Sequence, residues 1–297
     1  MFQKIELRKT RDFSAKINIT FEFIRQNFKT LGKAVMFISG PAILAQGLFS
    51  GIYRQKTMAQ GQGESFYRDF LSDLWLETST VFLLLAYVIS LTVVNEFVRL
   101  YEIKEDPRTI EAAEIWVGVK KNFFRMLFAL IFILFQTLIG LILLVIPGIY
   151  LIVTLSLVPP ILIIEKRGVL DSFWRSYSLI TATEKWWSTF GLIMVTIVII
   201  FFMSVVFSLP QAVFVFILGL HKTSTDLAEP VLWQQAGIVV GSVISTLGSN
   251  LLQSIVFLAL IFQFYNLVER KEALGLMNKL ESFGKTDVNS SRNDETY

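Results

Sequence analysis

Few residues of this 297-residue chain are of the types that do chemistry, and most of them border long apolar stretches. There is no cysteine, which excludes disulfides, thiolate metal sites and cysteine nucleophiles. The one histidine, His221, excludes a multi-histidine metal centre and a histidine pair for acid–base catalysis. The sequence also lacks a glycine-rich phosphate loop, a paired-carboxylate motif and a Ser-His-Asp set. We therefore expect a protein that is not an enzyme and that binds no cofactor or metal.

Two oppositely charged residues stand out because they flank one turn. Glu165 follows the charge-free run 126–164, and Arg175 lies in the amphipathic segment that comes next. We predict that they form a structural ion pair across this turn. The alternative is that both side chains face water and lipid headgroups at a membrane surface.

Glu96 and Arg99 lie three residues apart, so they can meet on one helix face. An acid inside a membrane would be a candidate for function. Glu96 stands at the end of its apolar segment, however, and we expect its side chain to extend to the membrane surface.

Small and polar residues form two parallel rows in the last apolar run. The first row lets another helix backbone approach closely, so one interpretation is helix packing. The other is a groove for a lipid headgroup or for a partner's transmembrane helix, which Gly241→Leu would block while the protein stays folded. The first row is Gly237, Gly241, Ser245, Ser249 and Gln253, and the second is Ser242, Thr246, Asn250 and Ser254.

The composition indicates a membrane protein, because 54% of the residues are hydrophobic and only 17% are charged. The run 126–164 has no ionisable residue and would form a helix of about 58 Å, about twice the 30 Å of a bilayer core. It therefore predicts two crossings with a turn at Pro147-Gly148. The equally long run 230–268 predicts one crossing, since its first half is rich in small and polar residues. Two crossings with a turn near 248–250 are the alternative.

We predict an all-α, polytopic membrane helix bundle of six transmembrane helices over residues 1–282, followed by a disordered cytoplasmic tail over 283–297. The fifth crossing is expected to end or kink at Pro210, because proline lacks the amide donor. The expected crossings are about 31–53, 74–98, 123–146, 149–165, 186–209 and 238–266.

Amphipathic segments at about 13–29, 108–121 and 168–182 precede three of these crossings, and we expect them to be interfacial helices. Similar joins follow them: "RQNFKTLGKAVMF", "KKNFFRMLFALIF" and "TEKWWSTFGLIMV". These joins predict a threefold repeat of an interfacial helix plus a hairpin. The alternative is that basic, aromatic-flanked helix starts are general in multispan proteins.

The basic residues are distributed unequally about the expected crossings. With six crossings, 23 Lys and Arg lie on the side of the termini, and Arg54, Lys56, Arg68 and Lys222 lie on the other. The positive-inside rule therefore predicts that the N- and C-termini are cytoplasmic.

Two stretches, "PGIYLIVTLSLVPPILIIEKRGVLDSFWRSYSLI" and "FYNLVERKEALGL", resemble the six-span membrane domain attached to some bacterial glycerophosphodiester phosphodiesterases. That domain also occurs as stand-alone proteins of unassigned function. Asn266 and Ala273 depart from its pattern, which tends to have Asp and Gly there. The resemblance implies the membrane fold and the bacterial cytoplasmic (inner) membrane. It does not imply phosphodiesterase activity, which belongs to a separate soluble domain. The residues that carry it are Pro147-Gly148, Glu165, Gly168, Arg175-Ser176, Tyr265 and 269–272.

Without a catalytic set, the sequence favours a non-catalytic scaffold or accessory subunit of a membrane complex. Its expected partners are membrane lipids and other membrane proteins but not nucleic acid, because Lys and Arg cluster at the bilayer edges. The alternative is a lipid- or small-solute-handling transporter that is not coupled to an intramembrane acid.

Overall fold

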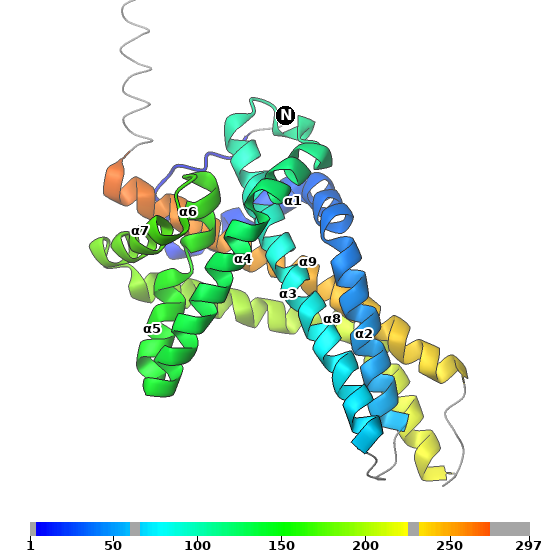
Figure 1. The fold of residues 1–297 in the computed structure, drawn as a ribbon. Helices are drawn as coiled ribbons and strands as arrows, with labels where there is room; N and C mark the ends of the chain where they lie inside the picture. Colours follow the sequence, from blue (N-terminus) through cyan, green and yellow to red (C-terminus); the bar gives the residue numbers. More distant parts are fainter. Residues whose placement is uncertain (1–3, 60–65, 225–231, 274–297) are drawn as a thin grey trace, which may run out of the picture.

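The computed structural model describes residues 4–59, 66–224 and 232–273, and the chain is all-helical in these ranges, with no strand (Figure 1). The all-α class predicted from the sequence is therefore confirmed. The tail 283–297 lies outside the described residues. The elements are α1 (Phe13–Ile38), α2 (Gly40–Ala59), α3 (Phe66–Ile103), the short η1 (Pro107–Thr109), α4 (Ala112–Leu143), α5 (Val145–Leu155), α6 (Val158–Ile164), α7 (Val169–Ala182), α8 (Trp186–Ser224) and α9 (Leu232–Glu272).

Within the described ranges, five helical segments are long and apolar enough to cross a membrane. A sixth is present if α1 and α2, which meet at a bend, count as one broken span. This arrangement fits a multi-pass membrane protein. The five segments are Asp73–Ile103, Ala112–Leu143, Val145–Ile164, Trp186–Ile217 and Gln235–Glu272.

The predicted crossing 31–53 is not one straight helix. α1 continues from Phe13 to Ile38, past the end of the predicted interfacial helix 13–29, and α2 starts at Gly40 at an angle of 62°. Pro41 explains the bend, because it has no N–H to continue the hydrogen-bond ladder and disfavours helical geometry at the residue before it.

The predicted boundary between the interfacial helix 108–121 and the crossing 123–146 is also wrong. After η1, a single helix α4 runs from Ala112 to Leu143. The join "KKNFFR" contains no glycine or proline, so nothing in it interrupts the helix. By contrast, α7 is separate from α8, and its bounds lie close to the predicted 168–182.

The hairpin that follows reverses at Leu144, whose extended backbone (φ −162°, ψ 141°) separates α4 from α5, and not at Pro147-Gly148 as predicted. Pro147 lies in the first turn of α5, where a proline is tolerated. Gly148 has a packing role, since a Cβ built on Gly140 would lie 3.0 Å from the Gly148 Cα atom. Glycine at both positions allows the two backbones to cross closely.

α8 runs through Pro210 without ending there, so of the two outcomes predicted for the crossing 186–209, an end or a kink, the end is wrong. Three glycines of α9 pack along α8 on both sides of this proline. Cβ atoms built on Gly237, Gly241 and Gly248 would lie within 3 Å of Phe214, Gln211 and Phe207, respectively. We infer that this close antiparallel packing offsets the one hydrogen bond that Pro210 removes.

α9 is the central helix of the bundle. In its most apolar window, 78% of the residues are buried, whereas the corresponding share is 22% in α4 and 17% in α8. It is one uninterrupted helix, without the alternative turn near 248–250. Phe262 of α9 packs at 5.6 Å, centroid to centroid, on Phe23 of α1, which also contacts Tyr101 of α3 at 4.8 Å.

The ends of α3 and α9 meet α1, α7 and the N-terminal residues 4–12 at one end of the molecule, hereafter the charged end (Figure 1). The residues 4–12, hereafter the strap, cross over α3 and α9. Their Ile5 and Leu7 side chains are buried. The strap therefore packs into the bundle and is not a free terminal segment.

Glu96 is not at the surface as expected; its side chain is 1% exposed. Arg99 Nε donates to its Oε2 atom at 2.7 Å, and Asn122 Nδ2 of α4 donates to its Oε1 atom at 2.6 Å. Gly118 makes room for the carboxylate, because a Cβ there would lie 2.5 Å from Glu96 Cδ. A buried charge needs such partners, and here they join α3 to α4.

Glu96→Ala should lower the stability of the protein by about 3 kcal/mol, because it leaves the side chains of Arg99 and Asn122 without their acceptor. Glu96→Gln, which keeps the shape and one acceptor, should lose less. Thermal unfolding in mild detergent measures both losses. Glu105→Ala, at an exposed residue of the same end, is the control and should unfold like the wild type. Equal stability of Glu96→Ala and the control would contradict the role of Glu96.

Candidate functional site

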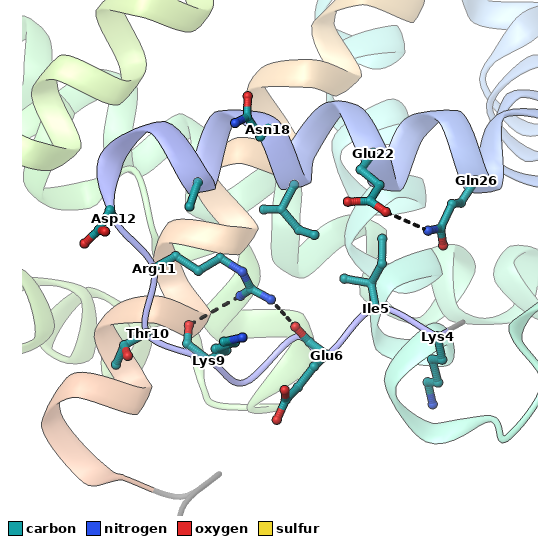
Figure 2. A pocket seen from close by; sticks show the side chains of 12 residues that line it. Lys4, Ile5, Glu6, Lys9, Thr10, Arg11, Asp12, Asn18, Glu22 and Gln26 are labelled. Atoms are coloured by element: carbon teal, nitrogen blue, oxygen red, sulfur yellow. Dashed lines mark hydrogen bonds between the residues drawn. The ribbon is translucent and has the colours of Figure 1, made fainter. Parts of the chain in front are cut away.

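The strap and α1 enclose a pocket of about 530 Å³ (Figure 2). Figure 2 shows the Arg11 guanidinium turned back to the carbonyl oxygens of Glu6 and Lys9. Burial lowers the pKa of Arg11, and the charge of Glu6 opposes this effect. The pocket is lined by three basic and three acidic side chains, so its charge favours neither an anion nor a cation. The basic ones are Lys4, Lys9 and Arg11, and the acidic ones are Glu6, Asp12 and Glu22.

The strap is fixed to α3 and α9 by polar contacts. Glu102 accepts hydrogen bonds from Arg8 Nε at 2.8 Å and from Tyr265 Oη at 2.6 Å. Asn266 Oδ1 accepts the backbone N–H of Arg11 at 2.8 Å. These contacts bring together residues about 94 to 255 positions apart, so no local sequence pattern could have revealed them. Their arrangement indicates a structural clamp.

Glu165 and Arg175, the predicted ion pair, lie together: Arg175 Nη2 is 3.0 Å from Glu165 Oε1. Glu272, at the end of α9, also contacts Arg175 Nη2, and Arg167 contacts Glu165. Burial lowers the pKa of Arg175, but the hydrogen bonds that Arg175 donates to the carboxylates of Glu165 and Glu272, together with their charges, outweigh it and leave the pKa above its ordinary value. The cluster joins the end of α6 to α7 and α9, and its contribution to stability stays a prediction.

A second hollow, hereafter the polar chamber, lies between α2, α3 and α9 and measures about 470 Å³. Gly47 and Gly51 of α2 bring that helix onto α9, since Cβ atoms on them would lie 2.8 Å from the Cα atoms of Val243 and Val239. α3 contributes the apolar wall of the chamber, and α2 and α9 contribute its polar groups. The lining residues are Gln46, Arg54, Leu83, Leu84, Tyr87, Ser245, Thr246, Ser249, Asn250 and Gln253.

The rows predicted on α9 therefore divide between two environments. Gly237 and Gly241 are closed off by α8, so this half is helix packing. A Cβ on Gly241 would lie 2.7 Å from the Gln211 Cα atom, and we expect Gly241→Leu to separate α8 from α9, contrary to the sequence-based expectation of an intact fold. Ser245, Ser249, Asn250 and Gln253 line the polar chamber.

Arg54 supplies the positively charged side chain of the polar chamber, and no sequence pattern marked it as a site residue. With the Gln211 amide oriented so that both of its polar atoms are satisfied, its oxygen accepts from Arg54 Nη1 at 3.0 Å, from Arg54 Nε at 3.3 Å and from Ser242 Oγ at 3.1 Å. In the described part of the chain, Arg54 forms no ion pair with a carboxylate. Among the described residues, none that lines the chamber is acidic.

Several polar groups of the chamber also lack partners among the described residues. Asn250 Nδ2 donates to the Thr246 carbonyl at 2.9 Å and reaches Gln46 Oε1 at 3.4 Å. The side chains of Ser245, Ser249 and Gln253 form no hydrogen bond with any described residue. Polar groups in an apolar bundle favour a partner that can satisfy them, such as water or a polar ligand.

A third hollow, hereafter the apolar groove, measures about 400 Å³ and lies between α3, α4 and α5. Leu84 and Tyr87 of α3 line both the groove and the polar chamber, so the two hollows share a wall. Thr137 is the only hydroxyl of α4 in the groove lining. It is 7% exposed, and its Oγ1 atom has no hydrogen-bond partner in the described part of the chain. The other lining residues are Val88, Leu127, Leu130, Ile131, Ile133, Leu134 and Ile152.

The family model of a domain of unknown function, DUF7847, matches residues 33–267 of the chain. The matched region contains the polar chamber, the apolar groove and Glu165–Arg175, while the strap precedes it. Neither a curated protein nor a solved structure matches the chain.

Glu165→Gln and Arg175→Gln should each destabilise the protein, and the double variant should lose about 1–2 kcal/mol less than the sum of the single losses, because the two side chains share one interaction. Chemical unfolding of the four proteins measures this coupling. The exposed pair Asp106–Arg108 is the control and should show no measurable coupling. Fully additive losses at Glu165 and Arg175 would contradict the predicted pair.

Proposed function

Because the chain belongs to the DUF7847 family, whose function is unknown, we propose a function from the structure of the bundle: a non-catalytic scaffold or accessory subunit of a membrane complex. The observation that supports this proposal is the outer face of α8. Five large apolar side chains there are between 51% and 68% exposed and are spaced by four and three residues in alternation. They are Phe202, Val206, Leu209, Val213 and Phe216.

Such spacing forms a continuous seam along one helix face, as at helix–helix contacts. α4 carries a similar stripe, which includes Phe124, Phe128 and Phe135. α4 and α8 are also the least buried of the helices that are apolar enough to cross a membrane. In a membrane, such exposed apolar helix faces are covered by lipid or by partner helices. We assign them to partner helices because large aromatic side chains provide extensive packing area.

We propose that the charged end faces the cytoplasm and that six crossings traverse a bacterial inner membrane, with α1 and α2 as the broken first crossing. The distribution of Lys and Arg supports this orientation. The resemblance to the phosphodiesterase-associated domain and the threefold repeat also stay proposals. A separate amphipathic helix, α7, precedes α8, but none precedes the second hairpin, where α4 is continuous.

A second candidate function, the binding or handling of a lipid, is favoured by a different observation. The polar chamber is lined by one positively charged side chain, Arg54, and it adjoins a groove lined almost entirely by apolar side chains. Acid-coupled transport is not implied, because the buried carboxylate Glu96 is held by Arg99 and Asn122 at the charged end.

The orientation can be tested with single cysteines, because the chain has none of its own. Thr57→Cys, at the far end of α2, should react with a membrane-impermeant maleimide in intact cells. Glu105→Cys, at the charged end, should react only after permeabilisation. Both residues are exposed, so both cysteines are reactive once accessible. Labelling of Glu105→Cys in intact cells would overturn the orientation.

The scaffold role predicts that a protein partner co-purifies at a fixed ratio in mild detergent. Replacing Phe202, Val206 and Leu209 by alanine should reduce the amount of this partner about tenfold, because it removes much of the exposed seam on α8. Ile146→Ala, an 81% exposed residue at the start of α5, is the control and should retain the partner. A wild-type preparation that contains lipid but no second protein would contradict the scaffold role.

A further inference from the structure

We propose that the polar chamber and the apolar groove form one binding site for a membrane phospholipid with an anionic headgroup. The inference deepens the second candidate function and is independent of the scaffold role. The headgroup phosphate lies in the chamber beside Arg54, and an acyl chain crosses the shared wall of Leu84 and Tyr87 into the groove.

The sign of the ligand charge follows from the chamber lining. Arg54 contributes a positive charge, and the other polar lining groups are neutral hydroxyls and amides. A guanidinium has five N–H donors, and the contacts with Gln211 use only Nη1 and Nε. Donors therefore remain for a phosphate, which suits the planar guanidinium well.

The neutral groups complete the headgroup site. Ser245, Ser249 and Gln253 lie on α9 opposite the apolar α3 wall and make no hydrogen bond to the described residues. Their spacing of four residues places them along one face of α9, about 6 Å apart. Hydroxyls and amides at this spacing can donate to phosphate oxygens or to the hydroxyls of a headgroup.

The apolar groove has the shape and chemistry of an acyl-chain site. Its α4 side extends from Leu127 to Thr137, which is about 15 Å of helix. Apart from the Tyr87 and Thr137 hydroxyls, the lining side chains are aliphatic or aromatic.

The site also explains why one ligand would occupy both hollows. A free phosphate would be held in the chamber but would not fill the groove, and an alkane would leave Arg54 and the serines unsatisfied. A phospholipid joins a phosphate to an acyl chain, so one molecule that passes over Leu84 and Tyr87 can fill both hollows. Arg54 lies near the end of α2 that is remote from the charged end, which places the headgroup toward the corresponding membrane surface.

The test is native mass spectrometry of the delipidated full chain titrated with dioleoyl phosphatidylglycerol, with dioleoyl phosphatidylcholine and with glycerol phosphate, which has the headgroup chemistry but no chain. Phosphatidylglycerol should bind with 1:1 stoichiometry. Phosphatidylcholine should bind at least tenfold more weakly, and glycerol phosphate should not compete. Equal affinity for the two lipids, or displacement of lipid by glycerol phosphate, would overturn the proposal.

Two variants examine the two halves of the site. Arg54→Gln should weaken phosphatidylglycerol binding about tenfold or more, as expected for the loss of a charge-assisted hydrogen bond. Leu134→Trp, at a residue that is 53% exposed, should fill the groove and weaken binding of the lipid without affecting the fold.

Lys56→Gln is the matched control, because Lys56 lies two residues from Arg54 on α2 and does not line the chamber. It should bind phosphatidylglycerol within twofold of the wild type. Circular dichroism and a monodisperse elution profile show whether each variant is folded. Wild-type affinity in folded Arg54→Gln, or an equal loss in Lys56→Gln, would contradict the headgroup site and leave the scaffold role unaffected.

Discussion

The last turns of α3 impose the main constraint on this bundle, because they carry two carboxylates, one buried at Glu96 and one partly buried at Glu102. A charge in an apolar interior is tolerated only when it is paired and hydrogen-bonded. Glu96 is held by Arg99 and by Asn122 of α4, and Glu102 is held by Arg8 of the strap and Tyr265 of α9. Each carboxylate thus fixes a different neighbour, and the end of α3 becomes the point where α4, α9 and the N-terminal segment are joined.

From these last turns of α3 the helices diverge. In Figure 1 the α2–α3 pair and the α4–α5 hairpin extend from the charged end in different directions. The polar chamber and the apolar groove lie on two sides of α3, between helices that the charged end holds together. The contacts at the end of α3 and the two hollows therefore belong together. Because the helices are fixed at the charged end, they can separate farther along and leave the hollows between them.

Much of the architecture could be predicted from the sequence, because apolar runs without charges identify helices of this kind directly. The all-α class and a helical segment near 168–182 followed from hydrophobic periodicity. The positions where helices bend or end were harder to predict. The bend before Gly40 depends on Pro41, whereas α8 continues past Pro210, where glycines of α9 pack on both sides of the proline. Whether a proline ends a helix was decided here by tertiary packing, which the local sequence does not contain.

The candidate site was predictable in part. The small-residue row of α9 indicated close packing or a groove, and both occur, Gly241 against α8 and Ser249 in the chamber. Which half of the row packs closely and which half lines the chamber depends on where α8 and α2 contact α9. Arg54 faces Gln211 and the chamber only because the glycines of α2 bring that helix onto α9. Glu96 looked like a residue at the membrane surface, because Asn122, a donor that helps to keep it buried, lies on another helix.

The most direct test of the role of Glu96 is a distance measurement between α3 and α4, away from the charged end. Spin labels on cysteines at Val81 of α3 and Ile142 of α4, which are 55% and 82% exposed, report their separation by pulsed electron paramagnetic resonance in lipid nanodiscs. If Glu96 fixes α4 to α3, the wild type gives one narrow distance distribution, and Glu96→Gln gives a broader one. An unchanged distribution in Glu96→Gln would show that the two helices are held in place by something other than this buried carboxylate.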